Sequence, residues 1–164
     1  MALAENRYNP VLLSELARLQ GDLQRARELV EAHLAWGERS GNFEAVVFAY
    51  LHLGLIAQHE GDLDRMYELV TAAGQQLEAL PGHWLLATYR LVVAMLLALR
   101  GDEDNTYRWL WAANEMGLGD TVDQDVASCL ADITHIASDK GWANVAKLAG
   151  RAGFDQMRRL GRIH

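Results

Sequence analysis

Three histidines are the residues of this chain whose type and spacing could do metal chemistry. His52 and His59 stand seven residues apart, which places them on one face of a helix, and His135 could oppose them across a groove. Zinc-binding helices favour histidines four residues apart, and a site here would also need an acid such as Asp132 or Asp139. We interpret the histidines as polar groups of a groove or surface, so the sequence predicts no metal site and no cofactor.

Two other pairs could support catalysis. Cys129 and His135 are six residues apart on different faces of one helix, and nothing in the sequence supplies an oxyanion hole. We therefore read the thiol as a small buried hydrophobe. Glu15 and Asp132 would form a carboxylate pair only if the fold brought them together. We expect no catalytic residue and no enzyme; a small helical enzyme with a groove carboxylate or histidine is the alternative.

The elements that would position these residues follow a fixed period. Gly21, Gly61, Gly101 and Gly141 stand 40 residues apart, and aspartate follows the first three. Glycine can close a helix in the left-handed conformation, and the aspartate can cap the next helix. A period of this size indicates a solenoid, in which each unit buries its apolar face on its neighbours.

Further breaks lie near Gly41, Pro81 and Gly117, and they divide the chain into about eight antiparallel helices. We expect them near 10–20, 22–40, 43–60, 62–80, 83–100, 102–116, 121–139 and 142–160. The predicted fold is all-α, a right-handed α-solenoid of about four tetratricopeptide-like helical hairpins. We expect a single domain over 1–164, with repeats at roughly 8–40, 42–80, 83–117 and 121–162.

The tetratricopeptide pattern fits each unit in part, and it fits the second repeat best. Small residues recur at Ser14, Gly54, Ala94 and Thr134, where they would let the two helices of a hairpin approach closely. The pitch of 40 residues exceeds the usual pitch of about 34.

Two stretches carry a resemblance to a known family: LARLQGDLQRARELVEAHLAWGERSGN and LGLIAQHEGDLDRMYELVTAAGQQLEAL. They resemble the long-pitch tetratricopeptide repeats of bacterial LuxR-type regulators, including the maltose-regulon activator, and of related ATPase-containing regulators. The ending CLADITHIASDKGWANVAKLAGRAGFDQMRRLG is similar to their last repeat. The resemblance implies a sensor or interaction module for transcription regulation. The chain lacks a phosphate-binding GxxxxGK[ST] loop and a basic recognition helix, so we expect a sensor segment or a stand-alone adaptor.

In such arrays the first helix of each hairpin lines a concave groove, and the 40-residue register carries its positions along the chain. An apolar floor with ionisable groups at both ends suits a protein or peptide partner or a small organic ligand. The predicted groove residues are Tyr8, Glu15, Arg18, Phe48, His52, Leu55, Gln58, His59, Val92, Met95 and His135.

The run from Leu91 to Leu99 is apolar on every side of a helix, so something must cover Val92 and Met95. The cover is either intramolecular packing or a ligand, a partner helix or a second copy of the chain. The last option makes the third repeat a homodimer contact, and with it a self-associating adaptor becomes an alternative function.

Composition limits the class of partner. The net charge of −7 argues against direct binding of nucleic acid, although five bases gather after Gly141, next to an acidic stretch from Gly101 to Asp139. We expect those bases to lie beside the acids within one fold rather than to form a docking patch. The longest apolar run is too short for a membrane helix, and the one cysteine fits a cytoplasmic protein.

Overall fold

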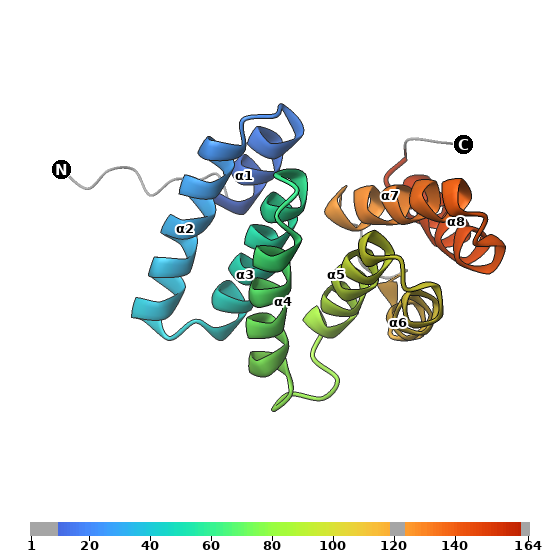
Figure 1. The fold of residues 1–164 in the computed structure, drawn as a ribbon. Helices are drawn as coiled ribbons and strands as arrows, with labels where there is room; N and C mark the ends of the chain where they lie inside the picture. Colours follow the sequence, from blue (N-terminus) through green and yellow to red (C-terminus); the bar gives the residue numbers. More distant parts are fainter. Residues whose placement is uncertain (1–9, 119–123, 162–164) are drawn as a thin grey trace. The chain divides into compact units, whose positions relative to one another are not determined.

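The protein is described by a computed structural model, which covers residues 10–118 and 124–161. These residues form an all-α fold with no strand among them (Figure 1). The eight helices are α1 (Pro10–Leu19), α2 (Leu23–Ser40), α3 (Phe43–His59), α4 (Leu63–Leu77), α5 (Leu85–Arg100), α6 (Glu103–Glu115), α7 (Gln124–Lys140) and α8 (Ala143–Arg159).

The predicted helix ends agree closely with those observed. The expected start of the seventh helix at 121 lies outside the described residues. Among the described helix ends, the main difference is the end of α4, which we expected at 80 and which lies at Leu77. Pro81 explains it, because a proline disfavours helical backbone in the residue before it and so helps to end the helix early. The all-α prediction is confirmed, while the solenoid of tetratricopeptide-like hairpins stays a prediction.

The 40-residue period is a repeated helix ending. Gly21, Gly61, Gly101 and Gly141 have φ values of 81°, 78°, 82° and 73°, all in the left-handed region. After each glycine, the next backbone N–H donates back to a carbonyl five residues earlier, as Asp62 does to Ala57 at 2.9 Å. This is the Schellman arrangement, which satisfies carbonyls that the helix end leaves free.

The residue after each glycine begins the next helix. Asp22, Asp62 and Asp102 each accept a hydrogen bond from the backbone N–H three residues on. Trp142 occupies the same place before α8 with a similar backbone, φ −81° and ψ 76°, but it makes no side-chain cap. The predicted glycine–aspartate turns are confirmed at all three positions.

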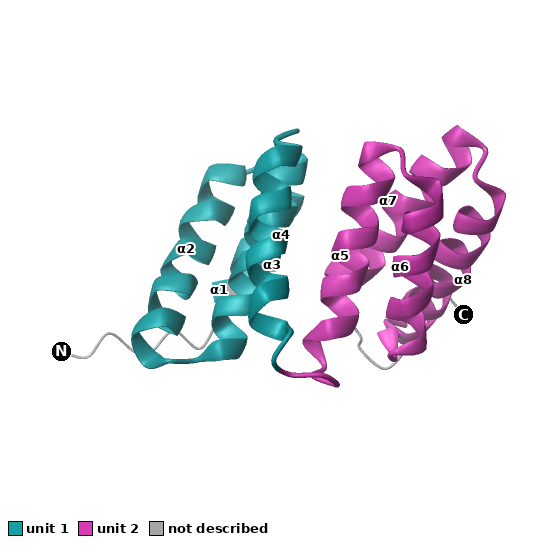
Figure 2. Ribbon diagram, turned by 60° about the horizontal axis from the view of Figure 1, so that its bottom comes forward, with its two compact units in different colours: residues 1–79 teal, residues 80–164 magenta. Residues whose placement is uncertain are grey.

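The chain divides into two compact units, Met1–Ala79 and Leu80–His164, which Figure 2 colours separately. In unit 1, α1 packs on α2, α2 on α3, and α3 on α4. In unit 2, α5 packs on α6 and α7 on α8, while α5 also contacts α7 and α6 contacts α8. The single domain that we expected over 1–164 stays a prediction.

Small residues let the helices approach closely where the sequence placed them. A Cβ added at Gly54 would lie 3.2 Å from Val70 Cγ2, so α3 and α4 are in tight contact there. At the equivalent place in the first hairpin, the hydroxyl of Ser14 donates to the carbonyl of Ala26 at 3.1 Å and links α1 to α2. The two small residues thus serve the same hairpin contact by different means.

Candidate functional site

Two of the predicted groove residues meet in unit 1. Nη1 of Arg18, near the end of α1, lies 3.3 Å from Nε2 of His59, at the end of α3. The other ring nitrogen of His59, Nδ1, lies 3.0 Å from the carbonyl oxygen of Leu55. Because a guanidinium can only donate, Nε2 must accept and Nδ1–H must donate to the carbonyl. With these roles, both ring nitrogens of His59 are engaged by neighbouring groups of the same unit.

Three ionisable side chains on α1 and α3 are buried. Glu15, Arg18 and His52 are 8%, 4% and 6% exposed. Ionisable residues are rarely buried to this degree unless other groups compensate them. A charge reversal at Arg18 would therefore disturb the fold as well as any binding, because the side chain is buried.

The rest of the predicted groove in unit 1 is mainly aromatic and apolar. The rings of Phe48 and His52 lie 4.3 Å apart between centroids, tilted by 32°, one turn apart on α3. Leu55 is buried and Gln58 is half-buried on the same helix. Tyr8 lies outside the described residues.

The predicted groove residues of unit 2 differ in their exposure to solvent. Val92 and Met95 on α5 are 1% and 0% exposed, which fits the intramolecular cover of the apolar run. His135 on α7 is exposed, and its Nε2 lies 3.4 Å from Oδ2 of Asp139. Cys129, on the same helix as His135, is buried as predicted.

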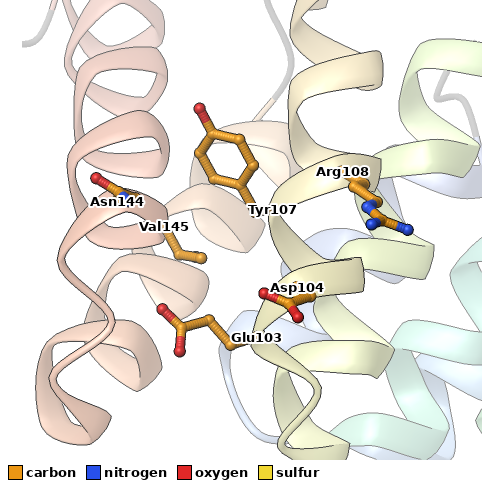
Figure 3. A pocket seen from close by; sticks show the side chains of 6 residues that line it. All are labelled: Glu103, Asp104, Tyr107, Arg108, Asn144 and Val145. Carbon is orange, nitrogen blue, oxygen red and sulfur yellow. The ribbon is translucent and has the colours of Figure 1, made fainter.

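Sequence reasoning missed a hollow between α6 and α8. It measures about 250 Å³ and lies between the first turns of the two helices (Figure 3). In the close-up, the Glu103 carboxylate points towards α8, whereas Arg108 lies on the side of α6 away from α8. The residues that line it are Glu103, Asp104, Tyr107, Arg108, Asn144 and Val145.

A second hollow adjoins the first on α6. It measures about 290 Å³ and is lined by Tyr107, Arg108 and Trp111. The rings of Tyr107 and Trp111 stack with centroids 6.3 Å apart and planes 25° apart, and Trp111 is 48% exposed. An exposed ring stacked on a half-buried one, next to carboxylates, suits an aromatic or cationic group of a partner.

Asp102, which caps the start of α6, has a lowered pKa. Hydrogen bonds from the Asn105 side chain and backbone lower the pKa of Asp102, and the charge of Arg108 lowers it further.

The two hollows beside α6 have a signal in the sequence. Glu103, Tyr107 and Trp111 are spaced four residues apart each time, which places them on one face of the helix.

No group of three or more histidine, cysteine, aspartate or glutamate side chains lies close enough to hold a metal ion in residues 10–118 and 124–161. Within these same ranges, no helix is both long and apolar enough to cross a membrane.

Comparisons with known proteins give a fold likeness. No protein-family model and no curated protein matches the sequence. Among solved structures, the crystal structure of BtubC (BKLC) from P. vanneervenii is similar, with a TM-score of 0.60 at 15% sequence identity. The match covers 98% of this chain and 69% of BtubC. At this identity the likeness concerns the fold alone.

Proposed function

We propose that the chain is a non-catalytic recognition module, the sensor or interaction part of a bacterial signal-responsive transcriptional regulator. Its helical hairpins form a tetratricopeptide-like solenoid, and a small ligand or a protein partner binds in the groove lined by the first helix of each hairpin. The repeated Schellman turns and aspartate caps support the repeat, since each recurs at 40-residue intervals.

The observation that carries the binding role is the Arg18–His59 contact. The two side chains are 41 residues apart in sequence, and the fold brings them to 3.3 Å on neighbouring first helices. A guanidinium next to an imidazole held in a fixed orientation can orient a polar ligand, while the ring of Phe48 supplies apolar area. Such a mixture of a few polar groups with apolar lining is typical of ligand grooves.

Native mass spectrometry of the purified protein, with His59→Ala as the variant, tests this function. We expect an additional mass of a few hundred daltons, or a bound polypeptide, on the wild-type protein. His59→Ala should lose at least half of it, because the exposed ring leaves without creating a cavity.

The matched control is Gln76→Ala, an exposed position on α4 outside the groove. It should keep the bound species, and both variants should keep the circular dichroism of the wild type. A bound species that survives His59→Ala unchanged would place recognition elsewhere. A wild-type protein that carries nothing, even after incubation with cell extract, would contradict the sensor role.

A further inference from the structure

Helix α1 has its charged side chains buried and its leucines exposed. Leu12, Leu16 and Leu19 are 50%, 48% and 50% exposed. The two charged residues of the helix, Glu15 and Arg18, are 8% and 4% exposed. Aliphatic side chains are usually the buried ones and charged side chains the exposed ones. The three leucines, called the leucine stripe below, are therefore the reverse of what a helix face in contact with water contains.

The leucine stripe points away from α2 and α3. On α1, the hydroxyl of Ser14 donates to the carbonyl of Ala26 on α2, and Nη1 of Arg18 lies 3.3 Å from His59 on α3. Leu16 is two residues from both Ser14 and Arg18, and residues two apart in an α-helix lie about 200° apart around its axis. The stripe is thus on the side of α1 opposite to its contacts with the rest of unit 1.

The repeat covers the equivalent face of α3. The 40-residue period equates Leu16 with Ile56, which is 1% exposed. Ala45 lies about three turns before Ile56 on the same face of α3, and a Cβ added at Gly37 of α2 would lie 3.0 Å from the Cβ of Ala45. This face of α3 therefore packs on the preceding hairpin. On α1 the same face is exposed, so a packing face of the repeat is open to solvent.

The outer faces of the first and last helices differ in character. The end repeats of an array usually have a polar outer face, because each has a neighbour on one side only. Helix α8 follows this rule, since its exposed side chains include Lys147, Arg151 and Arg158. Helix α1 does not follow it, because its exposed side chains are the leucine stripe. Exposed apolar patches of this kind mark contacts with other molecules.

We propose that a second copy of the chain covers the leucine stripe. In this dimer the α1 helices of the two copies lie antiparallel across a two-fold axis that passes by Leu16. A two-fold axis sets a face against the same face of the other copy, so a strongly charged face would repel itself. The leucine stripe is free of charge, whereas the same symmetry at α8 would set its exposed bases against one another.

The spacing of the stripe suits this symmetry. Leu12 lies four residues before Leu16 and Leu19 three residues after it, which is about 6 Å and about 4.5 Å along the helix. An antiparallel pair centred on Leu16 therefore brings Leu12 of each copy next to Leu19 of the other. Spacings of four and three residues are also those of the apolar seam of a coiled coil, in which helices pack side by side. Each copy contributes one helix, so the contact is small and we expect a weak dimer.

Sedimentation velocity of the full chain, from about 1 μM to about 1 mM, tests the proposal. The wild type should shift from monomer to dimer over this range. Leu16→Glu and Leu16→Lys should each weaken association by about ten-fold or more, because each sets two like charges against one another at the axis. Leu16 is half exposed, so both variants should keep the circular dichroism of the wild type.

Mixing the two variants distinguishes a second copy from any other occupant of the stripe. In a dimer of one Leu16→Glu chain and one Leu16→Lys chain, opposite charges meet at the axis. The equimolar mixture should therefore associate more strongly than either variant alone. This gain requires position 16 to face its own counterpart, which a different partner protein would not provide.

Phe154→Glu is the matched control. Phe154 is an apolar residue on a helix, 54% exposed, and it receives the same acid as Leu16→Glu does. It should leave the dimer as strong as in the wild type, because α8 takes no part in the contact.

Leu16→Cys gives a second measurement that introduces no charge. Mild oxidation should join two chains through position 16, since the two side chains meet at the axis. The wild type should stay single-chain under the same conditions, because its Cys129 is 4% exposed.

A wild type that stays monomeric over the whole range overturns the proposal. So does a dimer that Leu16→Glu leaves intact, a mixture no stronger than its components, or a Leu16→Cys chain that does not cross-link. Leu16 points away from His59, so Leu16→Glu should keep any species bound in the groove. The dimer and the groove function can therefore fail separately.

Discussion

At the scale of single residues, helical glycines differ by what surrounds them. A Cβ at Gly37 on α2 would lie 3.0 Å from Ala45 Cβ and 3.2 Å from the backbone nitrogen of Val46. A Cβ at Gly150 on α8 would have its nearest neighbour, Thr134 Cγ2, at 3.7 Å, an ordinary contact distance. The first glycine permits a close helix contact, whereas the second occupies a place that alanine fits.

We predict effects of opposite sign for the two alanine substitutions. Gly150→Ala should raise the free energy of unfolding by about 0.5–1 kcal/mol, because alanine is the better helix former. Gly37→Ala should lower it by about 1 kcal/mol, because overpacking against backbone outweighs the same gain. Urea unfolding followed by circular dichroism measures both. Equal effects would show that α2 and α3 adjust freely to the added carbon.

At the scale of elements, the helix starts show which part of the cap is backbone and which is side chain. Trp142 has nearly the same backbone angles as Asp22, at φ −84° and ψ 71°, yet α8 lacks the side-chain cap that α2 has. The ring of Trp142 instead lies 5.4 Å from the Lys140 ammonium. The backbone before α8 thus has the conformation of a capped helix start, but the Trp142 side chain cannot accept the capping hydrogen bond.

We predict that Trp142→Asp is more stable than Trp142→Ala by about 1 kcal/mol, the usual contribution of an aspartate cap. Both variants lose the tryptophan ring and its contact with Lys140, so their difference isolates the cap. Thermal unfolding of the two variants side by side gives this difference. Equal stability would mean that the N–H groups at the start of α8 are already satisfied.

At the scale of the whole molecule, charge is unevenly distributed. After Gly141 the chain has five bases and one acid, a net charge of +4, and so the rest carries −11 to give −7 overall. The excess of basic residues is therefore confined to the part of the chain after Gly141, and the rest of the chain is acidic.

The sequence alone determined the helices and the turns between them. Glycine conformation, aspartate capping and the restriction before Pro81 act within a few residues, so their signals are readable from local order. It also predicted the hairpin contacts at Ser14 and Gly54, because small residues there recur with the period.

Only the tertiary structure decided which side chains meet and which are exposed. The 3.3 Å contact of Arg18 with His59 and the full burial of Met95 depend on packing between helices distant in sequence. Trp111 and Met95 are both apolar residues of a helical repeat, yet one is 48% exposed and the other is buried. The period of the sequence predicts which residues share one face of a helix. The packing of neighbouring helices then determines whether that face is buried or exposed.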